Sequence, residues 1–235
     1  MSRIRMTLAA VTGMAMVLSL GWAIAVQAKD SDHDVSKANE RVEKSRQAYE
    51  ELVNSPDHGV PDYLLKNCKA IAIFPGVIKA AVGVGGRHGH GVVMMRGSNG
   101  EWSPPAFLTM TGGSWGLQLG ASSTDVVLFF MTDRSLHSLL SSKTTLGADA
   151  GVAAGPMGRT AEAGTDLKLN AEIYSYARSR GLYAGISLSG ARISEDQATT
   201  EEFYGRRIDA RRILMDRDVP TGRGSYESLQ HALPS

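Results

Sequence analysis

The segment AIAIFPGVIKAAVGVGGRHGHGVVMMR, residues 70–96, indicates the architecture of this chain most directly. Short apolar runs are separated in it by glycine and polar residues, a pattern typical of antiparallel strands joined by turns. We expect a first strand, AIAIF, that stops at Pro75-Gly76. The runs 77–85 and 90–96 should form strands on either side of the central glycines.

Similar strand-like runs continue along the chain. Residues 132–142, TDRSLHSLLSS, interrupt them with a helical pattern that Thr132 or Asp133 would cap. The strand-like segments are rich in Gly, Ala, Ser and Val, and they cover 106–111, 116–122, 125–132, 171–179 and 182–193. We therefore predict an α+β fold, a single domain with an antiparallel β core, barrel-like or sandwich-like, and flanking N- and C-terminal helices.

Helical segments lie on both sides of this core. Within residues 29–59, apolar or small side chains recur at alternating three- and four-residue steps, so one helix face should pack on the core. The positions are Val35, Ala38, Val42, Ser45, Tyr49 and Leu52. We place the β-rich domain at 60–206 and a C-terminal helical tail at 207–235.

The first residues are typical of an export signal. Two arginines precede an uncharged run that reaches Lys29, and Val26 and Ala28 are small residues at the two positions that a signal peptidase recognises. We predict a signal peptide over 1–28, cleaved after Ala28, and a periplasmic or secreted protein. The run is also long enough to span a bilayer, so an uncleaved membrane anchor is the alternative.

The glycine-rich part of the opening segment, VGVGGRHGHGVV at 82–93, raises the question of a phosphate or metal site. A dinucleotide fingerprint that begins at Gly83 would need glycine at position 88, where a histidine stands. His88 and His90 would share one face of a strand, but two ligands are too few for a zinc site. We expect a turn with close backbone packing, and neither a metal nor a cofactor.

Two residues resemble catalytic nucleophiles. Ser114 lies in GGSWG, which matches the Gly-x-Ser-x-Gly elbow of hydrolases, but the alternating residues that follow predict a strand where the elbow needs a helix. Asp133 and His137, the conceivable partners, are only four residues apart on one helix. Cys68 is the only cysteine, which excludes an internal disulfide, and the apolar run beside it favours a buried, inert thiol.

The charge pattern offers a binding site. Residues 63–100 contain no Asp or Glu but five basic residues, in a chain whose formal net charge is only +1. Such a patch would attract phosphates or anionic lipid headgroups. The candidate lipid-binding residues are Lys66, Lys69, Lys79, Arg87 and Arg96. Alternatively, acidic residues from the outer segments fold over the patch and neutralise it.

The segment AEIYSYARSRG, from residue 171, carries a second surface prediction. Strand alternation separates small residues, such as Ile173 and Ser175, from a Glu–Tyr–Arg face that includes Tyr174 and Tyr176. We expect the small-residue face to be buried and the tyrosine face to lie at a wet surface or groove. The alternative is that both faces are buried and the charges pair internally.

Five segments, in this order, resemble the SYLF domain family: AIAIFPGVIKAAVGVGGRHGHGVVMMR, GGSWGLQLGASSTDVVLFFMT, LGADAGVAAGPMGRTAEAGTD, AEIYSYARSRGLYAGISLSG and EFYG. The resemblance covers about Val60 to Arg206. In eukaryotes the family is associated with phosphoinositide binding and, in yeast relatives, with actin binding and bundling, whereas its bacterial members are exported. The resemblance implies a non-catalytic lipid-binding module of the exported bacterial type, in which actin binding is not expected.

Together, the residues and the resemblance predict non-catalytic binding of anionic lipid, through phospholipid or phosphoinositide-like headgroups, at a membrane surface. One alternative is a periplasmic structural or protein-interaction module without a lipid site, with envelope proteins as partners. A serine hydrolase that uses Ser114 is a remote alternative. We expect neither a nucleic acid nor a small-molecule substrate as partner.

Overall fold

A computed structural model describes residues 35–55, 59–82, 84–115, 120–141, 143–156, 171–179, 182–217, 219 and 225–234. The predicted signal peptide at 1–28 lies outside these residues, so its cleavage and the localisation stay predictions. None of the helices in the described ranges has the length and apolar character that crossing a membrane would require.

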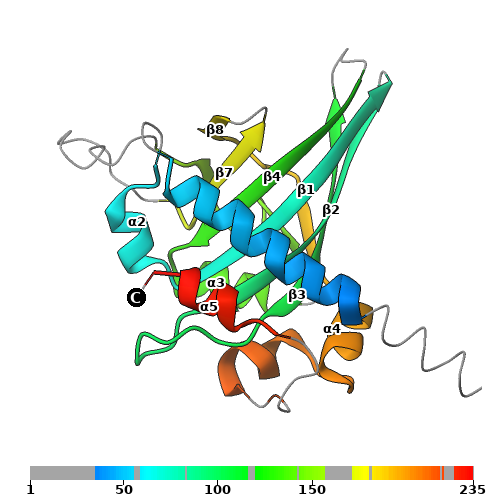
Figure 1. Cartoon of the computed structure of the whole chain (residues 1–235). Helices are drawn as coiled ribbons and strands as arrows, with labels where there is room; N and C mark the ends of the chain where they lie inside the picture. The colour runs from blue at the N-terminus through cyan, green and yellow to red at the C-terminus, as the bar shows by residue number, and fades with distance from the viewer. Residues whose placement is uncertain are drawn as a thin grey trace, which may run out of the picture.

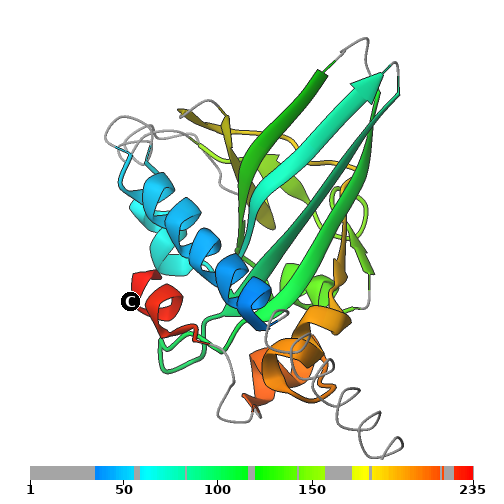
Figure 2. The same ribbon diagram turned by 45° about the vertical axis from the view of Figure 1, so that its right-hand side comes forward.

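Over the described residues, nine strands form one strongly curled sheet (Figures 1 and 2). They are β1 (Ala70–Val82), β2 (Val84–Met95), β3 (Ala106–Trp115), β4 (Gly120–Phe130), β5 (Lys143–Thr145), β6 (Val152–Ala154), β7 (Ile173–Ser179), β8 (Leu182–Gly185) and β9 (Arg192–Glu195). The order is β5-β9-β3-β2-β1-β4-β7-β6, with β8 also paired to β7. All pairs between these strands are antiparallel except β6 with β7. The predicted α+β class with a barrel-like core is confirmed, and the sheet has the form of a half-barrel.

The first strand does not stop at Pro75-Gly76, so that prediction was wrong. β1 continues to Val82, and the register with both neighbouring strands shifts at this point. Gly76 has a φ of +63°, a conformation that glycine adopts easily, and its N–H donates to Asp125 Oδ1 at 2.8 Å. Proline and glycine therefore create a bulge that bends the strand without ending it.

Helices cover one face of the sheet (Figure 1). The N-terminal helix, residues 35–53, crosses this face diagonally, and five of its six predicted stripe positions are buried: Ala38, Val42, Ser45, Tyr49 and Leu52. It is followed by α2 (Asp62–Asn67), and α3 (Asp133–Leu139) begins after β4 with Thr132 as its N-cap, as predicted. The later helices are α4 (Gln197–Tyr204), the π-helical turn η2 (Arg212–Asp216) and α5 (Glu227–Ala232).

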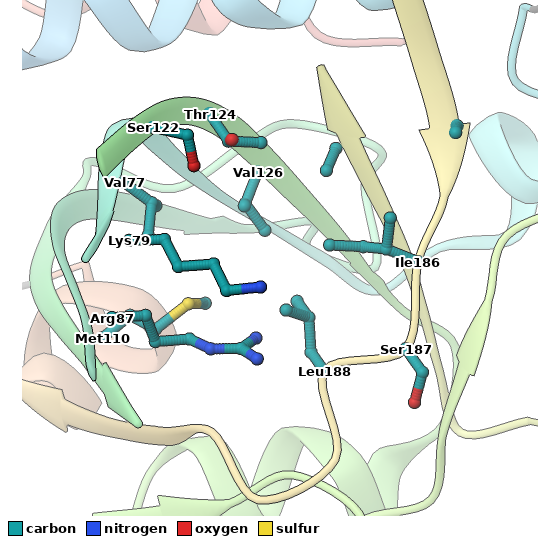
Figure 3. Close-up of a pocket in the computed structure, with 12 residues that line it drawn as sticks. Val77, Lys79, Arg87, Met110, Ser122, Thr124, Val126, Ile186, Ser187 and Leu188 are labelled. Atoms are coloured by element: carbon teal, nitrogen blue, oxygen red, sulfur yellow. The ribbon is translucent and has the colours of Figure 1, made fainter. Parts of the chain in front are cut away.

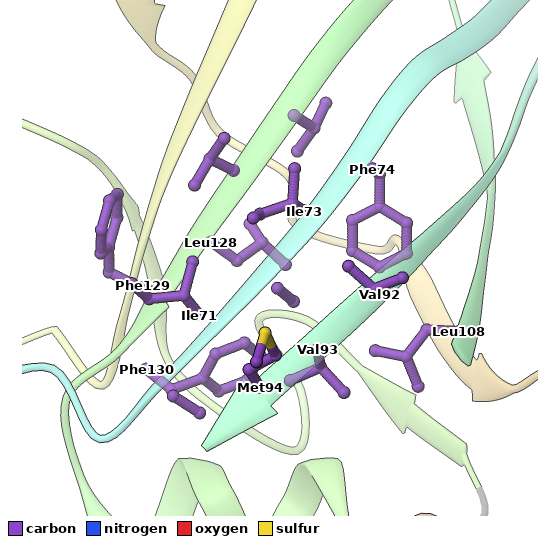
Figure 4. Packing of buried hydrophobic residues seen from close by; sticks show 14 of the residues in the cluster. Ile71, Ile73, Phe74, Val92, Val93, Met94, Leu108, Leu128, Phe129 and Phe130 are labelled. Carbon is purple, nitrogen blue, oxygen red and sulfur yellow. The ribbon is translucent and has the colours of Figure 1, made fainter. Parts of the chain in front are cut away.

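The core lies along the lower half of the central strands, where β1, β2 and β4 carry bulky side chains (Figure 4). Ile71, Phe129 and Met94 are each at most 1% exposed. The C-terminal segments join the same core through Ile213, Leu214 and Leu229, all of which are fully buried. Packing is therefore dense at this end of the sheet, which we call the base, where β1 begins and β2 ends.

The predicted exposure of the tyrosine face of β7 was wrong. Tyr174 and Tyr176 are only 4% and 0% exposed, and Ile173 and Ser175 on the opposite face are also buried. The Tyr176 hydroxyl donates to the carbonyl of Pro156 at 2.7 Å, and its ring packs edge-on against Phe129. Helices cover this face of the sheet, so both faces of β7 are inside.

The charges that flank these tyrosines pair internally, as the alternative reading required. Arg178 forms ion pairs with Glu51 of the N-terminal helix and, at 3.9 Å, with Asp125 of β4. Glu172 lies 3.5 Å from Arg134 of α3. Distant segments thus supply the opposite charges, which the local alternation of β7 could not reveal.

Candidate functional site

The face of the sheet opposite the N-terminal helix carries a cavity of about 460 Å³ (Figure 3). One wall is formed by the outer halves of the four central strands, towards the end where β1 finishes and β2 begins, which we call the tip. The other wall is formed by Ala177 of β7, Ala184 of β8 and the segment 186–188. The volume is within the usual range for small-molecule sites in proteins.

Lys79 and Arg87, two of the five predicted lipid-binding residues, meet in this cavity. They are direct cross-strand partners on β1 and β2, so their side chains share one face of the sheet. Figure 3 shows both side chains extending side by side into the cavity, towards Ile186 and Leu188. The structure therefore brings together two cations that are eight positions apart in the sequence.

The same row of the sheet continues on both sides of this pair. Ser122 of β4 lies opposite Lys79, and Gly112 of β3 lies opposite Arg87. A β-carbon at Gly112 would come within 3.2 Å of Arg87 Cγ, so the glycine leaves room for the stem of the arginine. The row thus presents the Ser122 hydroxyl and the two cations, next to a position, Gly112, that has no side chain.

Among the described residues, neither Lys79 nor Arg87 has a hydrogen-bond or ion-pair partner, and none of the residues lining the cavity is acidic. Arg87 Nε is buried and lacks a hydrogen-bond partner. A buried polar group without a partner costs free energy, and the cost is larger for a charged group. An anion that enters the cavity would supply the missing partner.

The other three predicted residues lie at the base, away from the cavity, and each has a partner there. Lys66 pairs with Asp62 within α2 at 3.8 Å, and Lys69 pairs with Asp133 at the start of α3. Arg96 donates to the carbonyl oxygens of Lys66, at 2.8 Å, and of Pro234, and stacks over the ring of Trp102. Acidic residues from outside the acid-free stretch neutralise two of these cations, and backbone carbonyls hold the third.

The two histidines of the glycine-rich segment lie on the helix-covered face of β2. His88 and His90 share one face, as predicted, with their Nε2 atoms 3.1 Å apart. His90 Nδ1 also lies 3.4 Å from Asp196, which receives a 2.8 Å hydrogen bond from Arg41. Within the described ranges there is no group of three or more side chains that could hold a metal ion. These contacts fasten the N-terminal helix to β2 and to the start of α4.

The glycines around these histidines pack closely, as predicted. A β-carbon at Gly89 would lie 2.7 Å from Val77 Cγ2, and one at Gly91 would clash with the Ile73 carbonyl and the Phe74 ring. Val82 and Val84 form the last described pair of the β1–β2 register. The segment is therefore a hairpin with close backbone approach and not a phosphate loop.

Comparison with known proteins identifies the family of this chain. A family profile described as "Ysc84: Las17-binding protein actin regulator" matches residues 111–235, more than half of the chain. The chain belongs to this family. Its resemblance to the SYLF domain family is thereby confirmed.

Curated relatives of this Ysc84-family chain come from animals and yeast. The SH3 domain-containing YSC84-like protein 1 of Rattus norvegicus is 36% identical over 71% of the chain and 49% of the relative. Protein YSC84 of Saccharomyces cerevisiae is 35% identical over 68% of the chain and 35% of the relative, and the yeast LAS seventeen-binding protein 3 is 36% identical over 70% and 36%. The chain spans about half or less of the length of these relatives.

The two candidate nucleophiles, Ser114 and Cys68, lie in a strand and in the buried core of this Ysc84-family fold. Ser114 belongs to β3, where it pairs with Gly85 of β2, and the next described element after it is the strand β4. The strand-to-helix elbow that a hydrolase needs is not formed by these elements. Cys68 is 1% exposed, and burial raises the pKa of its thiol to about 12, so it has little thiolate at neutral pH.

Sequence reasoning missed the second wall of the cavity. The wall comes from Ala177, Ala184, Ile186 and Leu188, far from the basic residues in sequence. The segment 182–193 was expected to be one strand, but it divides into β8 and β9 around a turn at Gly190, which has a φ of +81°. The glycine and serines of that segment were the available signal for this turn.

Proposed function

We propose that this Ysc84-family chain binds anionic lipid at a membrane surface without converting it, and that the Lys79–Arg87 cavity is the headgroup site. The observation that carries the proposal is the pair of cations without acidic partners, side by side on adjacent strands in a lined cavity. The resemblance to a family associated with phosphoinositide binding supports the same ligand class.

The expected electrostatic contribution is moderate. A basic residue close to an anionic membrane surface is worth about 1 kcal/mol. Two such residues give about 2 kcal/mol, which corresponds to roughly a 30-fold change in affinity. Because Lys66, Lys69 and Arg96 already have partners at the base, we assign them no direct part in the headgroup site and narrow the original five candidates to two.

Vesicle co-sedimentation tests the proposal. The full chain is mixed with vesicles of phosphatidylcholine alone or with added phosphatidylglycerol, at low and high salt. We expect binding only to the acidic vesicles, weaker at high salt because the Debye length shortens. The double variant Lys79→Gln/Arg87→Gln should bind roughly 30-fold less tightly.

The matched control is Lys66→Gln/Lys69→Gln, which removes the same charge at the base. It should bind acidic vesicles like the unmodified protein. Equal binding to both kinds of vesicle, or equal losses in the two double variants, would overturn the headgroup site.

Protein binding is the second candidate, because the family description and one yeast relative name a binding partner, Las17 or LAS seventeen. For this chain the partner would be an envelope protein. A chain that ignores acidic vesicles but pellets with envelope proteins, unaffected by Lys79→Gln/Arg87→Gln, would favour this function over lipid binding.

Export belongs to the proposal as well. A signal over residues 1–28 would place the lipid site at an envelope membrane. Mass spectrometry of the protein recovered from its producing cell should give a mature N-terminus at Lys29. Recovery of the intact N-terminus in the membrane fraction would instead indicate an uncleaved anchor.

A further inference from the structure

The cavity is polar at one end and apolar at the other. At the tip end, Arg87, Lys79 and Ser122 form one row across β2, β1 and β4. Towards the base, the β4 wall changes from Ser122 to Thr124 and then to Val126. The chemical character of the wall therefore changes along the strand direction within a single cavity.

The apolar end is built from residues that are in register. Val126 of β4 pairs with Ala177 of β7, which pairs with Ala184 of β8. The small side chains of these two alanines belong to the same wall of the cavity as Ile186 and Leu188, which Figure 3 labels. A soluble headgroup alone would leave this wall without a complementary surface.

We infer that the cavity binds one single-chain anionic amphiphile, with its carboxylate or phosphate between Lys79 and Arg87 and its alkyl chain against Val126, Ala177 and Ala184. The inference rests on the proposed lipid function and narrows its ligand to a molecule whose chain enters the protein. The anionic group would pair with the two cations, including the buried Arg87 Nε, and the alkyl chain would pack against the apolar wall. A fatty acid and a lysophospholipid share this chemistry.

Titration calorimetry of the full chain with defined amphiphiles tests the inference below their micelle concentrations. The probes are dodecanoate, dodecyl phosphate, shorter-chain homologues of both, and neutral dodecanol. Each methylene that becomes buried should raise affinity about fourfold. The two anionic series show whether a carboxylate or a phosphate is preferred. Affinity that is independent of chain length, or dodecanol that binds as well as the anions, would overturn the inference.

Ala184→Phe fills the apolar end without altering the cations. It should abolish the dependence of affinity on the alkyl chain length of dodecanoate, dodecyl phosphate and their shorter homologues. The matched control is Ala80→Phe, which adds the same ring at an exposed alanine on the opposite face of β1. If Ala184→Phe lowers the melting temperature severely, Ile186→Ser, in the half-buried segment after β8, serves instead and should also weaken long-chain binding.

The outcomes separate the inference from the proposed function. Charge-dependent vesicle binding with no chain-length dependence would overturn only the inference. Absence of vesicle binding together with chain-dependent binding of dodecyl phosphate would support the cavity and overturn the surface site. An Ala184→Phe variant that is folded and keeps the full chain-length dependence would also overturn the inference.

Discussion

Both ends of the β1–β2 hairpin have basic residues in or beside them in the sequence, but the fold surrounds these residues differently. At the base, carboxylates from outside the acid-free stretch pair with Lys66 and Lys69, and Arg96 donates to the carbonyl oxygens of Lys66 and Pro234. At the tip, Lys79 and Arg87 face a cavity without an acidic lining residue among those described. A local excess of positive charge therefore indicates an anion-binding site only where no other segment of the chain packs against it and supplies partners.

The ends also differ in packing, and two glycine substitutions should show the largest contrast. In Gly91→Ala the new β-carbon would overlap the Ile73 carbonyl and the Phe74 ring, both parts of the dense base. In Gly86→Ala, near the tip, its nearest neighbour would be the Gly112 carbonyl at 4.0 Å. We expect Gly91→Ala to lower the free energy of unfolding by about 3 kcal/mol and Gly86→Ala to change it by less than about 0.5 kcal/mol.

Urea unfolding followed by circular dichroism measures both values. Gly86→Ala is the control for the loss of a glycine from β2 itself. Similar losses in the two variants would mean that the tip is packed as tightly as the base.

The arginines at the two ends should respond in opposite ways to truncation. Arg96→Ala removes hydrogen bonds to two carbonyl oxygens and the stacking over Trp102, at a centroid distance of 5.0 Å. We expect a loss of about 2 kcal/mol in the free energy of unfolding. The Nε of each arginine is buried without a hydrogen-bond partner, but Arg87 also lacks the carbonyl partners that Arg96 has, so Arg87→Ala should leave stability unchanged or slightly higher.

Thermal melting of both variants, without lipid, provides the measurement. If Arg87→Ala destabilised the protein as much as Arg96→Ala, Arg87 would have a structural partner and its place in the binding site would be lost.

The contrast between the ends explains what the sequence could and could not reveal. The 3.6-residue periodicity of the N-terminal helix and the alternation of the strands depend on local positions, so the helix stripe and the α+β class were predictable. The partners of Lys66 and Lys69 depend on where α2 and α3 pack. The pairing of Lys79 with Arg87 depends on the hairpin register, and the Gly76 bulge shifts that register. Burial of Tyr174 and Tyr176 likewise depends on covering helices.

His90, between the two ends of the hairpin, should give a smaller effect that depends on pH. Burial and the nearby Arg41 guanidinium hold the pKa of His90 below its usual value, although Asp196 acts in the opposite direction. The folded protein therefore binds this proton less readily than the unfolded chain. The stabilising contribution is complete above the unfolded value of about 6.5 and is lost as the pH falls below it towards the folded pKa.

Unfolding free energies measured between about pH 7.5 and 5 should show this slope. His90→Gln should make the slope shallower, whereas His137→Gln, at an exposed position on α3, should leave it unchanged. An unaltered slope in His90→Gln would assign the acid sensitivity to other groups.

The smallest expected effect concerns the ion pairs at the base. Lys69 and Asp133 are 40% and 74% exposed in their side chains, and Lys66 and Asp62 are 73% and 61% exposed. Exposed pairs of this kind contribute between 0 and about 1 kcal/mol, because solvent screens them and ordering long side chains costs entropy. We expect Lys66→Ala and Lys69→Ala each to change the free energy of unfolding by less than about 0.5 kcal/mol and to leave acidic vesicle binding intact. In the sequence, these two lysines were the strongest argument for a lipid-binding patch at the base. Their removal therefore tests most directly whether Asp62 and Asp133 prevent them from binding lipid. A clear loss of vesicle binding in Lys69→Ala, with stability unchanged, would show that Asp133 releases this lysine to the membrane and that the base is a second contact surface.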